Sequence, residues 1–427
     1  MWWEIPGHLE TRQNRLLIAG IDACSLAESF GTPLFVYNGN RIIENFNRIK
    51  SNFSAFGKNP RIHYAVKANS HLAILELLQK QGSWIDAVSV NEVLLALEAG
   101  FPVEKILFTG TSVSNPELKK LIELGVTINI DSFSQMKRMK ELGFKGKASI
   151  RWNPGEGAGH HEHTITAGKF IKFGIPESRI EEAFKKADQY NLNVVGLHQH
   201  IGSGWLGKDV ETFLETVDKT LGVAKKAESI LGKSLEFVDF GGGPGIPYSQ
   251  QQKKFPLSQY ARGIAGKMDF HGINAEIAIE PGRYIVGDSG VLLVEVNTVE
   301  EKNVPVVGVN SGFTHLIRPA FYGSYHEIIL CNNVGGREQK SFMVAGNLCE
   351  SGDVFNENKK ELRELPVPVE GSILALLNAG AYGYVMASNY NSRLKPACLL
   401  LLNGKKQVIA ERQQFQDLIK KENKLSI

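Results

Sequence analysis

The fold is predicted from one stretch of the chain, Arg61-Ile62-His63-Tyr64-Ala65-Val66-Lys67-Ala68-Asn69-Ser70. Its apolar side chains alternate as they do in a strand, and apolar residues at helical spacing follow Ser70. Lys67 therefore lies where a strand gives way to a helix, which in parallel α/β folds is the end that carries the chemistry. A lysine there, backed by apolar residues, is a candidate nucleophilic amine because desolvation favours its neutral form. The alternative is an ordinary surface lysine at the start of a loop.

A regular alternation of strands and helices extends from this stretch. Two helix starts carry capping boxes, Ser89 with Glu92 and Ser114 with Glu117. Eight alternating strands and helices predict a (β/α)8 TIM-like barrel. A doubly wound open sheet is the alternative, but no Gly-x-Gly-x-x-Gly follows the first strand. The strand candidates are 62–66, 84–88, 105–108, 127–130, 148–152, 194–199, 235–240 and 275–280.

The pattern changes after residue 284, where strands follow one another with few helices between them. We expect two domains: an α/β barrel over residues 38–284, and a C-terminal all-β domain, a sandwich or barrel, over 285–427. Two apolar runs in residues 1–37 predict N-terminal strands that complete the second domain.

Composition excludes several classes of function. The formal net charge is only +3, so nothing indicates a nucleic acid or an anionic membrane as partner. No stretch approaches the length of a membrane span, and the N-terminus lacks the pattern of a signal peptide. The four cysteines have no metal-type spacing, which favours a reducing compartment and a cytoplasmic location.

Residues suited to chemistry collect at the predicted strand ends. They are Lys67, Asp86, Arg151, His198, His200, the run Gly241-Gly242-Gly243, and Glu280-Pro281-Gly282-Arg283. Consecutive glycines let backbone N–H groups surround an anion, and this fold binds phosphate after its last strands. An amine, a phosphate site and an acid that keeps a ring nitrogen protonated are what pyridoxal 5'-phosphate requires. The alternatives are a plain glycine turn and a structural ion pair between Glu280 and Arg283.

Further motifs then carry a resemblance that runs almost end to end. The sequence resembles the alanine-racemase-like, fold type III pyridoxal phosphate decarboxylases, and within them the diaminopimelate decarboxylases, including the decarboxylase half of bifunctional aspartokinase–decarboxylases. The matching segments are Tyr64–Asn69, His200–Ser203, Gly241–Gly243, Glu280–Arg283, Arg318–Tyr322, Cys349–Asp353, Ala379–Gly383 and Ser388–Arg393, with 159–164 for the bifunctional enzymes.

The resemblance implies a role for each matching residue of the barrel. Lys67 would bind the cofactor covalently, Glu280 would pair with its ring nitrogen, and His200 would stack on its ring. The residues implied in holding the phosphate are Ser203, Gly241, Gly242, Gly243, Gly282, Arg283 and Tyr382.

The resemblance also implies the substrate and the assembly. The reaction would be decarboxylation of meso-2,6-diaminopimelate to L-lysine, with Cys349 donating a proton after CO2 leaves. Cys349 and Glu350 would come from the other subunit of a homodimer that shares its active sites. Arginine suits the distal carboxylate because its planar fork binds both oxygens. The implied substrate-binding residues are Arg283, Arg318, Tyr322, Glu350 and Tyr382.

Three other functions stay open. One is a decarboxylase of another basic amino acid: ornithine, arginine or lysine. With ornithine or lysine, the enzyme would face a bare amine at the distal end and would need an acid there. A racemase of this fold would place an arginine on the ring nitrogen, which Glu280 argues against. An inactive regulatory homologue would lack the lysine or the acid.

Some residues depart from the family pattern or suggest another ligand. Thr314 stands where an acid is common, Trp205 lies in a Gly204-Trp205 pair that replaces a glutamine, and Cys398 replaces a glutamate. We expect the first two to alter the substrate pocket. The histidines between residues 160 and 163 are poorly spaced for a tetrahedral metal site, so we expect no metal and a loop near the substrate instead.

Overall fold

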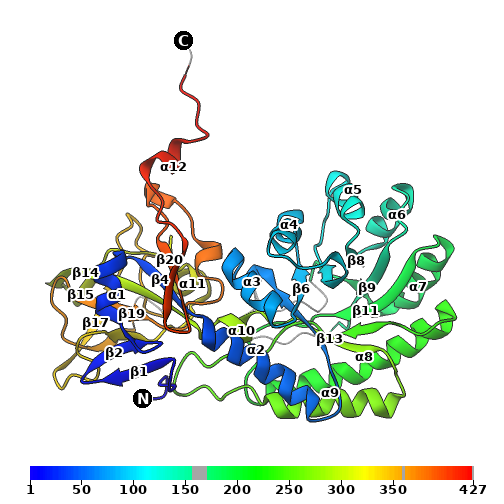
Figure 1. The fold of residues 1–427 in the computed structure, drawn as a ribbon, viewed down its shortest axis with the longest axis horizontal. Helices are drawn as coiled ribbons and strands as arrows, with labels where there is room; N and C mark the ends of the chain where they lie inside the picture. The colour runs from blue at the N-terminus through cyan, green and yellow to red at the C-terminus, as the bar shows by residue number, and fades with distance from the viewer. Residues whose placement is uncertain (156–170, 358–360, 426–427) are drawn as a thin grey trace. The chain divides into compact units, whose positions relative to one another are not determined.

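The structure, a computed structural model, describes residues 1–155, 171–357 and 361–425. The chain divides into two compact units (Figure 1). The β-rich unit comprises Met1–Ile42, Tyr248–Gln251 and Val286–Ile427. The barrel unit comprises Ile43–Pro247 and Gln252–Ile285.

The barrel unit contains a closed parallel sheet. Each strand pairs with the next in chain order, β8 pairs with β9, and β13 pairs back with β5, which closes the ring. A two-residue strand, β10 (Ile175–Pro176), also pairs with β9. The predicted eight-stranded barrel is therefore confirmed. Its strands are β5 (Arg61–Ala65), β6 (Trp84–Ala87), β7 (Ile106–Phe108), β8 (Thr127–Ile130), β9 (Lys147–Asn153), β11 (Asn193–Gln199), β12 (Phe237–Asp239) and β13 (Glu276–Ile279).

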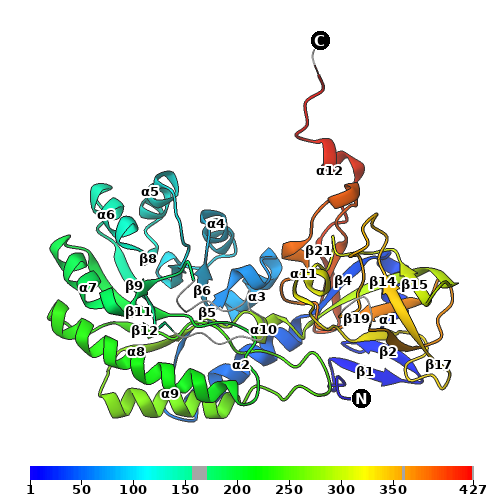
Figure 2. The ribbon, with the colours of Figure 1, turned by 180° about the vertical axis from the view of Figure 1, so that it is seen from behind.

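Helices follow the strands and surround the sheet (Figures 1 and 2). They are α2 (Gly39–Ser54), α3 (Leu72–Lys80), α4 (Val90–Glu98), α5 (Asn115–Leu124), α6 (Phe133–Glu141), α7 (Ile180–Gln189), α8 (Asp209–Leu231), α9 (Leu257–His271) and the short α10 (Arg283–Val286). The long helices α8 and α9 lie side by side in both views. Within the described part of the chain, every helix is too short or too polar to cross a membrane.

The two predicted capping boxes form to different extents. At α5 the Ser114 hydroxyl accepts from the Glu117 N–H, and the Glu117 carboxylate accepts from the Ser114 N–H, so the box is complete. At α4 the Ser89 hydroxyl accepts from the Glu92 N–H. The Glu92 carboxylate, however, accepts from Val88 N–H at 2.7 Å, one residue before the cap. The start of each helix is fixed by these contacts.

The second unit is rich in antiparallel β-structure and includes the N-terminal strands, as predicted. In its larger sheet β4 (Leu34–Asn38) lies between β14 (Gly290–Glu301) and β20 (Ala397–Leu402). Its other strands are β1 (Leu9–Arg12), β2 (Arg15–Ile18), β3 (Ile21–Asp22), β15 (Pro305–Val309), β16 (Ile328–Leu330), β17 (Gln339–Ala345), β18 (Arg363–Pro366), β19 (Ile373–Leu376) and β21 (Lys405–Ala410). Its helices are α1 (Ala23–Phe30), α11 (Arg318–Tyr322) and α12 (Phe415–Ile419).

One apolar core joins the three central strands of this sheet. Val36 of β4, Leu293 of β14 and Leu399 of β20 are all fully buried in it. Every residue of β4 is buried, which explains its continuous apolar run. The N-terminal segment is thus held by the same hydrophobic contacts as the C-terminal strands.

Candidate active site

The carboxyl ends of neighbouring barrel strands bring the predicted barrel residues together. Lys67 lies in a 3-10 turn, Val66–Ala68, directly after β5, and Asp86 lies in β6 opposite Ala65. Across the barrel, His198 of β11 pairs with Asp239 of β12. Parallel strands end at the same edge, so these side chains share one face of the barrel.

Lys67 is held by a buried carboxylate. Its Nζ lies 2.6 Å from Asp86 Oδ2, and Asp86 is completely buried. The Thr109 hydroxyl donates to the other oxygen of Asp86. Glu92 lies beside this pair; burial, opposed by the Val88 N–H and the charge of Lys67, raises its pKa to about 7. The Lys67 amine is thus positioned by the Asp86 carboxylate, and both oxygens of that carboxylate are hydrogen-bonded.

Glu280, directly after β13, is a buried acid in contact with a histidine. His198 Nε2 lies 3.1 Å from Glu280 Oε1, and both side chains are almost fully buried. Burial raises the pKa of Glu280, but His198, followed by Lys67 and His63, lowers it to about 2. The side chain is therefore an anion at neutral pH, as a partner for a protonated ring nitrogen must be.

The ring of His200 is fixed by the glycine run. Gly242 N–H donates to His200 Nδ1 at 3.0 Å, so the ring proton of the neutral form lies on Nε2. Enclosure of the ring, followed by the charge of Arg151, lowers the pKa of His200 well below its usual value. His200 is therefore a neutral ring held in one orientation.

The glycine run is tied to the loop that carries Ser203. The N–H groups of Gly204 and Trp205 both donate to Gly243 O, at 2.9 and 3.0 Å. A Cβ at Gly243 would come within 2.3 Å of the fully buried Trp205 ring, and its φ of 130° also favours glycine. Trp205, the departure from the family pattern noted above, therefore packs on this glycine.

The residues present fit a phosphate-bearing aldehyde cofactor. Among the described residues, the buried N–H groups of Gly243 and Gly282 have no hydrogen-bond acceptor, so they can donate to an anion. Arg283 is buried and its Nη2 lies 3.5 Å from Ser203 Oγ. An amine, a buried carboxylate and these donors are the groups that pyridoxal phosphate requires.

Arg318 and Tyr322 belong to the β-rich unit. Arg318 is 2% exposed, its Nη1 lies 2.7 Å from Tyr248 Oη, and its Nη2 lies 3.2 Å from Ser324 Oγ. His326 Nε2 accepts from Arg318 Nη1 at 3.4 Å. These three contacts fix the direction of the guanidinium. Tyr322 is half-buried and ends the same short helix, α11.

Cys349 and Glu350 are exposed in a turn of the β-rich unit. Asp353 organises that turn by accepting from the N–H groups of Phe313 and Leu348, at 2.7 and 2.8 Å. Tyr382, in the same unit, has a φ of 56°, a strained conformation for a bulky residue. The predicted site residues thus fall into two groups, one in each unit.

Sequence reasoning missed three side chains and left one prediction outside the described residues. The Thr109 hydroxyl donates to Asp86, and Tyr248 contacts Arg318. Asp239 lies beside His198 on the neighbouring strand. The strand-end rule applied to 235–240 would have found Asp239, whereas no sequence signal places Tyr248 in the β-rich unit. Thr314 and Cys398 are buried. The predicted histidine-rich loop near the substrate, residues 160–163, lies outside the described residues.

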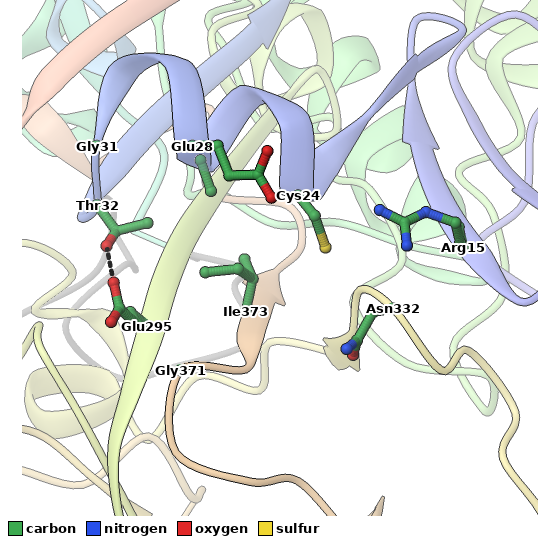
Figure 3. A pocket seen from close by; sticks show the side chains of 10 residues that line it. Arg15, Cys24, Glu28, Gly31, Thr32, Glu295, Asn332, Gly371 and Ile373 are labelled. Atoms are coloured by element: carbon green, nitrogen blue, oxygen red, sulfur yellow. Dashed lines mark hydrogen bonds between the residues drawn. The ribbon is translucent and has the colours of Figure 1, made fainter.

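A separate cavity of about 470 Å³ lies in the β-rich unit (Figure 3). Arg15, Glu28 and Glu295 contribute charge to its lining. Arg15 Nε lies 2.6 Å from Asp22, and Glu295 accepts from the Thr32 hydroxyl at 3.2 Å. Its lining contains none of the predicted site residues. We therefore do not assign the chemistry to this cavity.

Comparison with known proteins defines the class. Residues 40–287 match the family model of the pyridoxal-dependent decarboxylases, pyridoxal binding domain. The barrel and its strand-end lysine agree with that class of enzyme.

Full-length relatives narrow the class further. The chain is 43% identical to a diaminopimelate decarboxylase of Methanothermobacter thermautotrophicus, over 96% of each chain. It is 34% identical to that of Bacillus subtilis, over 97% of each. The crystal structure of the M. jannaschii diaminopimelate decarboxylase with L-lysine superposes with a TM-score of 0.90 at 33% identity, covering 99% of both chains. The chain belongs to the diaminopimelate decarboxylase family.

Proposed function

We propose that this protein decarboxylates meso-2,6-diaminopimelate to L-lysine and CO2, the last step of lysine biosynthesis. The observation that carries the proposal is the strand-end set: an amine at Lys67, an anion at Glu280 and free N–H donors at Gly243 and Gly282. These groups support pyridoxal phosphate, which supplies an electron sink for the electrons of the broken Cα–carboxylate bond.

The barrel residues bind and orient the cofactor. Lys67 would be its covalent attachment, Glu280 would keep its ring nitrogen protonated, and His200 would lie against its ring. Asp86 would hold the Lys67 amine whenever that amine is free, as it does in this structure. Ser203, Gly243, Gly282, Arg283 and Tyr382 would donate to the phosphate. Gly241 and Gly242 would line its site, since their N–H groups donate to Asp239 and His200.

The substrate is an amino acid at both of its ends, and arginine suits the end that does not react. We assign the distal carboxylate to Arg283, Arg318 and Tyr322, with Tyr382 alongside. The fixed direction of Arg318 supports this role because a guanidinium held in advance loses less entropy when it binds.

We further propose a homodimer in which Cys349 and Glu350 reach the active site of the partner subunit. Both residues are exposed in a turn that Asp353 keeps in shape, so they are available to a second copy of the chain. Cys349 then donates the proton that replaces CO2, and Glu350 binds the distal amine. The reaction takes place in the cytoplasm, where thiols stay reduced.

A panel of four candidate substrates tests the reaction. CO2 release is measured from meso-diaminopimelate, L-lysine, L-ornithine and L-arginine with cofactor supplied. We expect release from meso-diaminopimelate alone. Release only from the three substrates without a distal carboxylate would overturn the roles of Arg283 and Arg318, and no release from any of them would favour an inactive homologue.

A further inference from the structure

Three adjacent barrel strands end in a buried cluster of His198, Asp239 and Glu280. His198 pairs with Asp239 in register, and Asp239 pairs with Ala278, two residues before Glu280. One nitrogen or oxygen of each side chain lies within 4.8 Å of the others. Of these three residues, only Glu280 has been given a role, as the partner of the cofactor's ring nitrogen. The roles of His198 and Asp239 have not been explained.

Two carboxylates this close in a dry environment cannot both be charged without strong repulsion. Burial, followed by the charge of Glu280, raises the pKa of Asp239 well above its usual value. The pKa of Glu280 moves in the opposite direction. Asp239 is therefore the neutral acid of the pair, and Glu280 is the anion.

The position of the proton on His198 follows from its contacts. Its Nε2 faces Glu280 Oε1, whereas its Nδ1 has no hydrogen-bond partner among the described residues. A buried N–H without an acceptor costs more than a bare lone pair of the same ring. Nε2 therefore carries a proton and donates it to Glu280.

We propose that His198 is a positioning residue for the cofactor: it occupies Oε1 of Glu280, so that a single charged oxygen, Oε2, is left for the ring nitrogen. Asp239, as a neutral acid, leaves Glu280 as the charged carboxylate of the pair and fixes the glycine run by accepting Gly241 N–H at 2.8 Å. One charge of each sign then meets at the ring nitrogen. This inference rests on the proposed function because it needs a cofactor with a protonated ring nitrogen.

Other charged groups also act on the cluster. The Coulombic effects on Glu280 and Asp239 come from Lys67, His63, Asp86, Arg61 and Arg151. Unlike these groups, His198 acts on Glu280 through a hydrogen bond as well as through its charge. Its substitution therefore changes the direction of the carboxylate as well as the local charge.

Binding of two cofactor forms tests this role without measuring turnover. Dissociation constants are determined for pyridoxal phosphate and for its analogue in which carbon replaces the ring nitrogen. The wild-type protein should prefer the natural cofactor. His198→Leu should reduce that preference by roughly tenfold, because one hydrogen bond to a charged group is lost, and His198→Gln, which keeps an N–H donor, should restore part of it.

Controls separate this role from general damage to the fold. His315→Leu makes the same change at a buried histidine of the β-rich unit and should leave the preference intact. Asp239→Asn, which imposes a neutral side chain, should reduce the preference less than His198→Leu does. The inference would be overturned if His198→Leu left the preference unchanged or if Asp239→Asn reduced it equally. One bound metal ion per purified chain would also overturn it. Failure of the wild-type protein to bind either form would instead contradict the proposed function.

Discussion

Lys67 Nζ lies 2.6 Å from Asp86 Oδ2, so the candidate nucleophile is paired with a carboxylate that is completely buried. The Thr109 hydroxyl satisfies the other oxygen. The Lys67 side chain is about one-third exposed, whereas that of Asp86 is fully buried. The two substitutions that break this pair should therefore lower the free energy of unfolding by different amounts. Loss of Asp86 leaves an amine that water can reach, whereas loss of Lys67 leaves a buried charge.

The first prediction concerns stability without cofactor. Lys67→Met should lower the free energy of unfolding by roughly 1–3 kcal/mol, because the Asp86 carboxylate keeps its burial and loses its cation. Lys67→Met combined with Asp86→Asn should recover most of that loss. Chemical denaturation of the cofactor-free proteins measures both values. Strictly additive losses in the double variant would mean that the two side chains are not coupled.

The second prediction is a pH dependence from Glu92. Its pKa in the folded protein is about 7, above the ordinary 4.5, so the folded state binds the extra proton between these values. Its contribution to stability is therefore complete below pH 4.5 and is lost as the pH rises through 7. Glu92→Gln keeps an acceptor for Val88 N–H, and it should unfold like the wild type at low pH but be about 2–3 kcal/mol more stable at high pH.

Glu117 provides the matched control for that experiment. It also caps a helix, but its hydrogen bonds with Ser114 lower its pKa. Its contribution is present above the ordinary pKa of a glutamate and is lost as the pH falls. Glu117→Gln should therefore destabilise the protein at neutral pH, opposite in sign to Glu92→Gln. The same sign for both would contradict the assigned environments.

The third prediction concerns Arg318. Arg318→Lys should weaken binding of meso-diaminopimelate and of L-lysine by roughly tenfold or more, because a lysine cannot bind both oxygens of a carboxylate. Pentane-1,5-diamine, which has no carboxylate, should bind both proteins similarly. Competition against a bound ligand measures all three affinities. An equal effect on the diamine would assign Arg318 to structure alone.

The fourth prediction concerns the shared site. Lys67→Ala and Cys349→Ala should each be nearly inactive. When the two are mixed and allowed to exchange subunits, half of the dimers become mixed, and each mixed dimer holds one intact site, so about a quarter of wild-type activity should return. Exchange is confirmed by native mass spectrometry. Full activity in Cys349→Ala alone, or no recovery after confirmed exchange, would contradict the proposed assembly.

The sequence predicts the barrel well because each of its strands is short, apolar and separated from the next by a helical pattern. It also places the groups at strand ends, since parallel strands end on one face. Contacts between side chains on different strands could not be predicted in this way. The pairing of His198 with Glu280 depends on the register of β11, β12 and β13, which no local pattern specifies.

Other features could not be predicted because they depend on tertiary packing. Tyr248 contacts Arg318 from a four-residue segment of the β-rich unit that lies, in the sequence, between two parts of the barrel unit. The residues next to Tyr248 in the sequence do not indicate that it belongs to the β-rich unit. Trp205 departs from the family pattern, and its packing explains why residue 243 is a glycine. A side chain at position 243 would collide with the Trp205 ring.

The covalent attachment of the cofactor to Lys67 is the central claim, and one measurement tests it directly. The protein loaded with pyridoxal phosphate is reduced with borohydride, digested and analysed by mass spectrometry. We expect the reduced cofactor on the peptide that contains Lys67, at one per chain, and on no other lysine. Attachment to a different lysine, or no attachment in a protein that releases CO2 from meso-diaminopimelate, would contradict the account.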